Sequence, residues 1–378
     1  MISTKNIVEG DLKIVDVSRK NRNIKIIRKE GTSFFLKQPN ISDESDSITI
    51  KREALFYTKT QLENDFLQLK NFVPRIMDFD EDKNIMVTEL LNGLSLNEYN
   101  YFISKGIIRY EDAADLGRIF ATLHSISVDK THDSRLNFLP RYAPSFLIVV
   151  RPNPELFKTI SPAGFQLLRL IQEYSALQDS LEELYSAWNP LTIVHGDIKW
   201  DNVICVEDSN FKETTTNKSE QSQSRVDQPS FSMVITDWET VSIGDPAWDI
   251  GGIFHEFIRY WLSSVLSYSA GKTIEQIITN TSFPIQNIQL AIRSFWFTYL
   301  KNIGLNNREK SDDLLIRSTK FCAARLVQTA YEFLYSSNTF SNIVIYMVQI
   351  AFNIFNDVEK AIIHLFGIPF RDIKWSNE

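Results

Sequence analysis

The stretch IVHGDIKWDNVIC, residues 193–205, raises the main question about this chain. Between two apolar runs it places the polar side chains His195, Asp197, Lys199, Asp201 and Asn202. A further carboxylate, Asp237, follows the next apolar run, SMVIT. A polar hairpin without chemistry would explain this pattern, and so would a site that handles phosphate groups. The remainder of the sequence favours the second interpretation.

Length and charge exclude several classes of protein. A chain of 378 residues is long for one core and suits two lobes or domains. Hydrophobic residues make up 43% of the chain, which is enough to bury a substantial interior. The 40 basic and 47 acidic residues give a formal net charge of −7, so no overall positive field gathers nucleic acid. We therefore expect a folded protein without a nucleic-acid partner.

Two features bear on the location of the protein. The opening residues, MISTKNIVEGDLKIVDV, lack a basic segment followed by a long apolar core. The longest apolar stretch, residues 342–355, contains Asn and Gln and is shorter than the ~20 residues of a membrane helix. We expect a cytoplasmic protein that does not bind membranes. Its two cysteines, Cys205 and Cys322, are then expected to be reduced, buried thiols.

The first 91 residues show the alternation that is typical of small antiparallel sheets. Three short runs, rich in β-branched and aromatic residues and separated by turn formers, are residues 11–18, 23–29 and 33–38. Apolar spacing predicts a helix from residue 50 to 62, and two further strands lie within residues 73–93. We therefore predict an N-terminal lobe, residues 1–91, built on an antiparallel sheet.

Helical periodicity dominates the rest of the chain. Helices are predicted at residues 95–106, 111–126 and 161–188, and in aromatic-rich segments after Asp249. Residues 207–230 contain almost no large apolar side chains, so we predict a flexible insertion between two hairpin strands, with partner docking as the alternative. The predicted fold class is α+β, with a small antiparallel β lobe and a larger, mainly helical lobe, residues 92–378.

Lys37 and Glu53 are candidates for handling phosphate. Phosphoryl transfer depends on positioning and charge neutralisation more than on covalent chemistry. Lys37 ends the apolar run FFLK, and Glu53 lies sixteen residues later on the predicted helix. A buried strand lysine needs a carboxylate partner, and such a pair can hold the α- and β-phosphates of a nucleotide. The alternative is a strand-end lysine in solvent.

The polar stretch supplies the remaining parts of such a site. Asp197 is followed five residues later by Asn202, which matches the H-x-D-x-x-x-x-N spacing of the protein-kinase catalytic loop. A turn of this kind points the carboxylate at a hydroxyl and the amide at a metal ion. Asp237, directly after an apolar run, suits a ligand of Mg²⁺ on nucleotide phosphates. Lys199 either meets the γ-phosphate or remains a solvated turn lysine, and Asp201 fits a turn residue.

These motifs resemble those of the aminoglycoside phosphotransferase and choline kinase-like enzymes, which have a protein-kinase-like fold. The matching stretches are HGDIKWDNVI, ITDWE and GDPAWDI, and MVTELLNG resembles the strand and hinge between two lobes. The resemblance covers roughly residues 10–300. It implies a bilobal fold, ATP or GTP as co-substrate, and Mg²⁺ as cofactor.

The resemblance also implies roles for residues of the catalytic loop, residues 195–202. Asp197 matches the catalytic base, and Lys199 stands beside it in the same loop. Asn202 and Asp237 match the ligands of Mg²⁺. The loop would therefore carry both a proton acceptor and one of the metal ligands.

Other positions match the nucleotide site and its support. Lys37 is expected to pair with Glu53, and residues Glu89 to Leu91 to offer backbone groups to adenine. His195 and Asp249 match residues that brace the catalytic loop. We expect no metal-ligand role for His195.

The sequence also departs from protein kinases. No G-x-G-x-x-G motif lies between the first two predicted strands, where residues 18–23 read SRKNRN. Only eleven residues separate Asp237 from Asp249, and no A-P-E motif follows. The first feature is typical of the small-molecule kinase branch. The second argues against control through a phosphorylated activation segment.

The resulting hypothesis is a phosphotransferase that moves the γ-phosphate of ATP or GTP to a hydroxyl of a small molecule, using Mg²⁺. One alternative is a kinase-like enzyme that phosphorylates Ser or Thr of a peptide in a peptide-modification pathway. Another is a non-catalytic kinase-like protein that binds a partner. Loss of function would be expected to erase at least one of Lys37, Asp197, Asn202 and Asp237. Since all four are present, an enzyme is favoured.

Composition also bears on the acceptor. From Val241 to Glu378 the chain carries twelve acidic and twelve basic residues, so this part supplies no acidic excess for a polycationic aminoglycoside. Aromatic residues cluster there instead: Phe254, Phe257, Tyr260, Trp261, Phe295, Trp296, Phe297 and Tyr299. We expect most of them in helix cores. A neutral or weakly cationic hydroxyl compound, or a peptide, is the expected acceptor.

Overall fold

The computed structural model describes residues 6–40, 44–100, 108–126, 136–148, 160–207, 231–267, 284–335, 337 and 339–370. The chain forms two compact units. The first contains Met1–Ile103 and Trp200–Val241, and the second contains Ser104–Lys199 and Ser242–Glu378.

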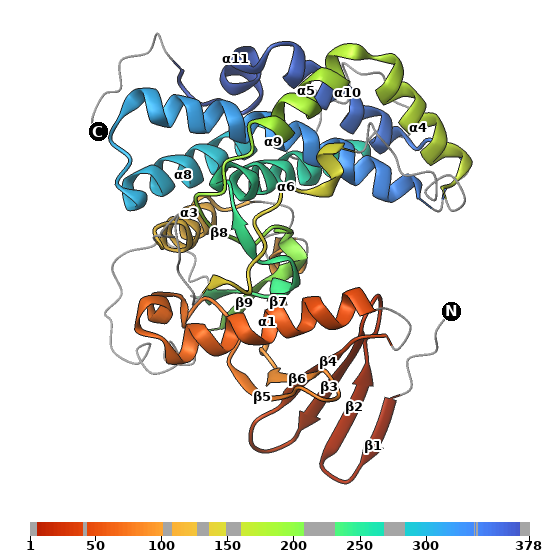
Figure 1. The fold of residues 1–378 in the computed structure, drawn as a ribbon, viewed down its shortest axis with the longest axis vertical. Coiled ribbons are helices and arrows are strands. Elements are labelled where there is room, and N and C mark those ends of the chain that lie inside the picture. The colour runs from red at the N-terminus through yellow and green to blue at the C-terminus, as the bar shows by residue number, and fades with distance from the viewer. Residues whose placement is uncertain are drawn as a thin grey trace, which may run out of the picture. The chain divides into compact units, whose positions relative to one another are not determined.

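The first unit contains a six-stranded antiparallel sheet with the strand order β1-β2-β3-β4-β6-β5. The strands are β1 (Asn6–Glu9), β2 (Leu12–Asp16), β3 (Arg22–Arg28), β4 (Phe34–Gln38), β5 (Ile76–Asp80) and β6 (Ile85–Glu89). Helix α1 (Glu44–Leu62) runs alongside this sheet (Figure 1) and contacts β4 and β5. The predicted antiparallel N-terminal sheet is confirmed.

Side-chain pattern explains why α1 packs where it does. Ile50, Ala54 and Tyr57 recur at helical spacing, and each is at most 1% exposed. On the sheet, Lys37 of β4 is opposite Asn23 of β3 and Met86 of β6. Lys37 is only 4% exposed, so this register buries its ammonium group inside the unit.

A second sheet of the first unit joins distant parts of the sequence. Its strand order is β10-β9-β7. The strands are β7 (Gly93–Ser95), β9 (Val203–Glu207) and β10 (Phe231–Ile235). The short helix α2 (Leu96–Glu98) follows β7, and one-turn helices cover Trp200–Asn202 and Trp238–Thr240. Because β7 pairs with β9, the first unit extends beyond the predicted lobe boundary after Leu91.

The second unit is mainly helical. Its helices are α3 (Tyr110–His124), α4 (Pro162–Glu173), α5 (Ser175–Ser186), α6 (Pro246–Ser267), α8 (Ile285–Ile303), α9 (Arg308–Leu334), α10 (Asn342–Asn356) and α11 (Val358–Lys360). A short 3-10 helix covers Ser145–Ile148 and a short π-helix covers Ala361–Leu365. The strands β8 (Thr192–Val194) and β11 (Ser242–Gly244) pair with each other. The predicted α+β class is therefore confirmed.

Helices α6 and α9 lie against each other at close range. A Cβ atom added to Gly251 of α6 would stand 2.7 Å from the backbone oxygen of Ser318 in α9, so this crossing requires glycine. Five of the predicted core aromatics are at most 1% exposed, namely Phe254, Phe257, Phe295, Trp296 and Tyr299. The expectation that most of these aromatics form helix core is confirmed.

Several predicted elements differ from the structure. Strand β1 was not predicted, because four residues beside the Gly10-Asp11 turn give too short a pattern. The predicted helix 161–188 is broken at Tyr174, whose backbone is extended (φ −98, ψ 92) and whose ring packs on Phe352 of α10. The predicted helix 95–106 is described only as far as Asn100. Of the predicted insertion 207–230, residues 208–230 lie outside the described residues.

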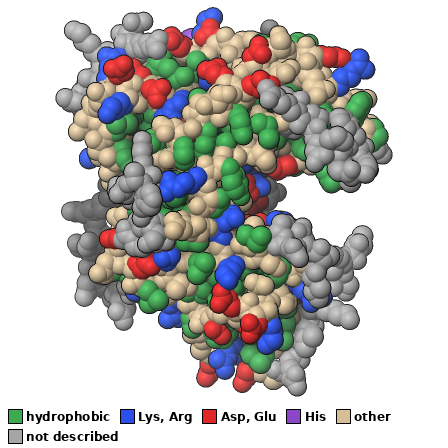
Figure 2. Space-filling view, in the orientation of Figure 1, with side chains coloured by type: hydrophobic (Ala, Val, Ile, Leu, Met, Phe, Trp, Pro, Cys, Tyr) green, Lys and Arg blue, Asp and Glu red, His purple; other side chains and the backbone are tan. Residues whose placement is uncertain are grey.

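Two further expectations concern cysteines and membranes. Cys205 and Cys322 are buried thiols outside any disulfide, as predicted. Among the described residues, no helix combines the length and the apolar character required to cross a membrane. Figure 2 shows acidic and basic side chains interspersed over the face that it draws.

Candidate active site

Lys37 is the centre of a polar cluster in the first unit. Its Nζ atom lies 2.8 Å from Glu53 Oε2, 2.6 Å from Asp237 Oδ1 and 3.0 Å from Glu239 Oε2. The side chain of Lys37 is 5% exposed. The predicted pair between Lys37 and Glu53 is therefore present, and the alternative of a solvated lysine is wrong.

Helix α1 holds Glu53 firmly in this cluster. Glu53 is 1% exposed, and its Oε1 accepts hydrogen bonds from the hydroxyl of Tyr57 at 2.9 Å and from the backbone N–H of Trp238 at 3.0 Å. The ring of Trp238 stacks on Phe56 at 4.6 Å between centroids. Glu53 thus links the helix to the segment that carries Asp237.

Asp237 lies in the turn after β10 with an unusual backbone conformation. Its φ of 65° and ψ of 54° fall in the left-handed region, which costs about 1 kcal/mol or more for a residue with a side chain. Asp and Asn tolerate this region better than most residues do. The preceding residue, Thr236, donates its N–H and its hydroxyl to the carbonyl of Asn202, at 2.8 and 3.1 Å. The two predicted metal ligands are thereby connected through adjacent backbone.

Glu239 is a member of the cluster that the sequence did not single out. Asn21 donates to its Oε2 at 3.0 Å, and Lys20 lies 3.4 Å from its Oε1. Arg52 donates to its backbone carbonyl at 3.3 Å. The loop after β2, which replaces a glycine-rich motif, is therefore tied to the same cluster as Lys37. The sequence signal was its position in ITDWE, two residues after Asp237.

The charges of this cluster do not balance. Burial alone would lower the pKa of Lys37, but the carboxylates of Glu53, Asp237 and Glu239 outweigh it and raise that pKa above its usual value. Lys37 is therefore protonated. Counted as ionised, the three carboxylates and the ammonium group of Lys37 carry a formal charge of −2. Lys20 also reaches Glu239, but it pairs with Asp46 at 3.1 Å and so leaves this sum unchanged.

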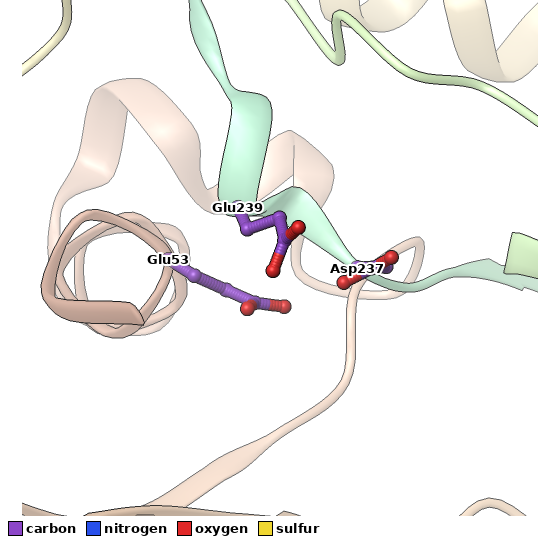
Figure 3. A group of neighbouring side chains, drawn as sticks. All are labelled: Glu53, Asp237 and Glu239. Atoms are coloured by element: carbon purple, nitrogen blue, oxygen red, sulfur yellow. The ribbon is translucent and has the colours of Figure 1, made fainter. Parts of the chain in front are cut away.

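The donor atoms of the cluster fit a hard divalent cation. One carboxylate oxygen each from Glu53, Asp237 and Glu239 lies within 4.8 Å of the others (Figure 3). In the figure Glu53 extends from α1 toward Glu239, and Asp237 lies beside them. All donors are oxygen atoms, which suits Mg²⁺ and does not suit a soft, thiolate-seeking metal. The excess negative charge of the cluster also favours a divalent cation.

The residues predicted to meet adenine lie at the end of strand β6 and directly after it. Glu89 donates its N–H to the carbonyl of Arg75 at 2.9 Å, and Leu90 donates to Ser33 at 2.9 Å. Within the described residues, the N–H of Leu91 has no such backbone partner. Leu91 is thus the better placed of the predicted residues to donate a hydrogen bond to a base.

In the second unit, Asp249 braces the start of the catalytic loop. Its carboxylate accepts hydrogen bonds from the N–H of His195 at 2.7 Å and of Gly196 at 3.0 Å. Gly196 has a φ of 86°, which only glycine adopts without strain. His195 is fully buried, and its Nδ1 accepts from the N–H of Asp197 at 3.2 Å. Both residues therefore brace the loop, as the resemblance implied.

A buried histidine supports Asp249 from behind. Nε2 of His124 lies 3.4 Å from Oδ2 of Asp249, and its Nδ1 lies 3.0 Å from the hydroxyl of Tyr299. Burial would raise the pKa of Asp249, but the hydrogen bond and charge of His124 outweigh it and lower that pKa. Asp249 therefore stays ionised in a fully buried position.

The candidate base, Asp197, is contacted by two cations. Arg325 of α9 lies 2.8 Å from its Oδ1, and Lys199 lies 3.0 Å from its Oδ2. Burial alone would raise the pKa of Asp197, but Arg325 and Lys199 outweigh it and hold that pKa below its usual range. Asp197 is therefore ionised and available to accept a hydrogen bond.

The remaining loop residues are placed as follows. Lys199 is 37% exposed, so it is both partly solvated and paired with Asp197. Asp201 accepts a hydrogen bond from Asn97 at 3.1 Å on the surface of the first unit, which suits the turn role expected for it. Arg325 was missed, because it lies 128 residues from Asp197 and no local motif connects them.

An apolar groove of about 390 Å³ lies on α4, α5 and α10 of the second unit. None of the predicted site residues lines it. The groove therefore plays no part in the chemistry considered for Asp197.

Comparison with solved structures shows a shared fold. A Plasmodium vivax ethanolamine kinase superposes with a TM-score of 0.53 at 17% identity, over 92% of this chain and 82% of that chain. A choline kinase from Cryptosporidium parvum (TM-score 0.48, 12% identity) matches over 94% of this chain and 92% of its own. A macrolide 2'-phosphotransferase from Brachybacterium faecium (TM-score 0.44, 14% identity) matches over 93% and 94%.

Sequence comparison adds nothing to this result. No protein-family model matches the chain, and no curated protein sequence matches it. At 17% identity the ethanolamine kinase supports an argument about fold and not about substrate. The chain therefore has the fold of that kinase, and the predicted resemblance to aminoglycoside phosphotransferase and choline kinase-like enzymes is confirmed at the level of the fold.

Proposed function

We propose that the protein transfers the γ-phosphate of ATP or GTP to a hydroxyl group of a small molecule. The observation that carries this proposal is the buried Lys37, whose Nζ lies within 3.0 Å of carboxylates from α1 and from the turn after β10. A buried charge persists when it is paired, and its usual reason in this fold is to hold nucleotide phosphates. The kinase-like fold supports the same proposal.

Lys37 and Leu91 are assigned to the nucleotide. The ammonium group of Lys37 neutralises the α- and β-phosphates, and Glu53 holds that group in place. Leu91 donates its N–H to the base, and Glu89 contributes its backbone at the end of β6. Nucleotide binding thus draws on residues of the first unit.

Asp237 and Asn202 are the proposed ligands of Mg²⁺. The oxygen donors and the formal charge of −2 around Lys37 fit a divalent cation. When bound, Mg²⁺ supplies neutralisation of the charge that develops on the phosphates. Hydrogen bonds from Thr236 to Asn202 keep the two ligand-bearing segments together.

Asp197 is the proposed base. Its ionised carboxylate accepts the proton of the acceptor hydroxyl at the point of transfer, and the hydroxyl oxygen attacks the γ-phosphorus. The bond from the γ-phosphorus to the β,γ-bridging oxygen breaks, and the nucleoside diphosphate leaves. Lys199, which contacts the same carboxylate, offers a positive charge to the transferred group. Asp249 and His195 keep the loop backbone in place while this happens.

The burial of aromatic side chains in the second unit supports one class of acceptor over another. Most aromatic residues that could have formed a cation-binding cage are buried in helix cores. A quaternary ammonium group would need such aromatic faces. This supports the expectation of a neutral or weakly cationic hydroxyl compound, with a Ser/Thr peptide as the competing acceptor.

Thermal unfolding tests nucleotide binding directly. A ligand that binds the folded state raises the melting temperature by mass action. We expect stabilisation by ATP or GTP with Mg²⁺, and a smaller effect when a chelator removes the metal. Absence of any metal-dependent stabilisation by either nucleotide would make the proposal untenable.

A nucleotide-consumption screen tests turnover. Neutral polyols, amino alcohols, aminoglycosides and Ser/Thr peptides serve as acceptors, and mass spectrometry identifies the phosphorylated product. Product formed from a small hydroxyl compound supports the proposal, and product formed only from peptides supports the alternative. Nucleotide binding without turnover on any acceptor or on water would indicate a non-catalytic binding protein.

A further inference from the structure

Arg325 is a buried cation in the middle of helix α9. Its side chain is 3% exposed, and one terminal nitrogen donates to Asp197 Oδ1 at 2.8 Å. The other terminal nitrogen donates to Gln328 at 3.2 Å. The guanidinium carbon stands 5.3 Å from the ring centroid of Trp248. The guanidinium group is therefore held on two edges and one face, and it presents a fixed N–H direction to Asp197.

Lys199 contacts the same carboxylate less firmly. Its side chain is 37% exposed, and its ammonium group sits on a flexible stem. A planar guanidinium loses less freedom on forming each hydrogen bond than such an ammonium does. Of the two cations, Arg325 is therefore the one that fixes the direction of the Asp197 carboxylate.

Trp248 connects Arg325 to the backbone of the catalytic loop. Its ring nitrogen donates to the carbonyl of Gly196 at 2.7 Å, while its ring lies against the guanidinium group of Arg325. Trp248 is 3% exposed. The backbone before Asp197 and the cation beside Asp197 thus share one rigid support.

We propose that Arg325 is a positioning residue for phosphoryl transfer, acting through Asp197. It holds the carboxylate in the direction that receives the proton of the acceptor, and each carboxylate oxygen keeps a lone pair for that proton. This inference rests on the proposed function. Because Arg325 is not among the residues assigned to the nucleotide, its loss should lower turnover and leave nucleotide binding unchanged.

Other charged groups near Arg325 are already engaged. Glu256, 1% exposed, binds Arg259 through two contacts of 2.9 Å. Glu332 is exposed on the next turns of α9. Burial lowers the pKa of His255, which is therefore neutral. Arg325 thus makes its side-chain hydrogen bonds to Asp197 and Gln328, while Glu256 and Glu332 act on it through their charge alone and help to keep it protonated.

Three variants test the role of Arg325. Arg325→Met removes the guanidinium group, and Arg325→Lys keeps a charge without the planar fork. Arg317→Met is the matched control, since Arg317 lies on the same helix and forms an ion pair with the buried Asp245. Both Met variants lose a buried ion pair of α9, so a general loss of packing affects both. The assay measures kcat and the nucleotide KM, with water or any acceptor found by the screen.

The expected result separates turnover from binding. Arg325→Met should lower kcat about 100-fold, the usual scale for a misplaced reacting group, with a nucleotide KM within about threefold of wild type. Arg325→Lys should recover part of kcat. Arg317→Met should stay within about threefold of wild type in both constants. Equal kcat in the two Met variants, or a KM change as large as the kcat change, would overturn the inference.

A double-mutant cycle tests the contact without any activity. Melting temperatures are compared for Arg325→Met, Asp197→Ala and the double variant, since alanine at 197 removes the acceptor of the Arg325 hydrogen bond. We expect the double variant to lose less than the sum of the single losses, since the two groups form one pair. Strict additivity would contradict the pairing. A wild-type protein that consumes no nucleotide would refute the proposed function and this role together, whereas active wild type with unaffected Arg325→Met refutes this role alone.

Discussion

The acidic clusters of the two units differ in their balance of charge. In the first unit, three carboxylates surround the ammonium group of Lys37, and Lys20 reaches only one of them, Glu239. In the second unit, the single carboxylate of Asp197 is contacted by two cations, Arg325 and Lys199. One cluster therefore lacks positive charge, and the other has more than its acid requires.

This difference corresponds to two tasks in phosphoryl transfer. A cluster with excess negative charge gains by binding a divalent cation and its nucleotide. A carboxylate with cations on both oxygens stays ionised and fixed in direction, so it can accept the hydrogen bond of an acceptor hydroxyl, although its lowered pKa makes it a weaker base. The same residue type is thus given a metal-binding or a proton-accepting role by its neighbours.

Replacing Asp197 should have the largest effect on turnover. We expect Asp197→Asn to lower kcat by roughly 10² to 10⁴-fold, the scale of general base catalysis, with nucleotide affinity nearly unchanged. Asparagine still accepts a hydrogen bond from Arg325, so the fold should persist. Steady-state kinetics and nucleotide titration provide the check. Wild-type turnover in this variant would show that Asp197 is not the base.

Removing the cation from the first cluster should have the next largest effect. We expect Lys37→Met to destabilise the protein by about 3 kcal/mol, because it leaves the buried carboxylate of Glu53 uncompensated. Glu53→Gln should cost less. Chemical denaturation gives the free energy of unfolding of each variant.

The pair in that cluster is tested by the corresponding double variant. Since Lys37 and Glu53 form one ion pair, the double variant should lose less stability than the two single losses added together. Additive losses would mean that Lys37 depends on Asp237 and Glu239 more than on Glu53.

Replacing Asp237 should affect the metal and leave the backbone intact. Asparagine tolerates the left-handed conformation found there, so Asp237→Asn should fold. At a nucleotide concentration of about 100 Kd, the wild type should gain roughly 2.7 kcal/mol of stability, and the variant should lose the Mg²⁺-dependent part of that gain. Thermal unfolding with and without a chelator measures it. An unchanged Mg²⁺ dependence would exclude Asp237 as a ligand.

Asp112 is a buried acid whose negative charge is only weakly compensated by its neighbours. Replacing it should have the smallest effect on stability. It is 3% exposed, Arg109 lies 3.6 Å away, and burial raises its pKa from 3.8 to about 6. Between these values the unfolded state releases the proton first, so stability falls as pH rises through this window. We expect Asp112→Asn to stabilise the protein by about 1 kcal/mol near neutral pH and not near pH ~4.

The pH dependence of unfolding checks this expectation. Denaturation of wild type and Asp112→Asn is compared across the window from 3.8 to about 6. Parallel curves for the two proteins would show that Asp112 is compensated as well as Asp197 is. That result would weaken the contrast between paired and unpaired acids.

Parts of the site that depend on local spacing were predictable from the sequence. Asp197 and Asn202 lie five residues apart, and Lys37 and Glu53 lie sixteen residues apart on a strand and the following helix. Such spacings reflect the backbone geometry of one loop or one strand-helix unit. Arg325 has no comparable signal, because packing of α9 brings it to Asp197. The only sign of its role in the sequence is that a basic residue interrupts the mostly apolar run FCAARLVQTA.

The same distinction applies to the fold. Alternating apolar residues predicted β2, β3 and β4, since burial of one sheet face imposes that alternation. The break at Tyr174 contains neither glycine nor proline, so no local signal marks it. Packing of the Tyr174 ring on Phe352 accompanies the extended backbone there, and such contacts override helical propensity.

The order in which the ribosome delivers the chain bears on the first unit. Lys37 and Asp237 are 200 residues apart, which corresponds to about 10 to 40 s of synthesis at typical rates of ~5–20 residues per second. Glu53 emerges within seconds of Lys37, but β7 must wait for β9 to complete its sheet. The nascent first unit therefore exposes an unpaired strand edge while α3, α4 and α5 are being made. Folding of the two units is interleaved during translation, and this chain should depend on chaperones until residue 241 has left the ribosome.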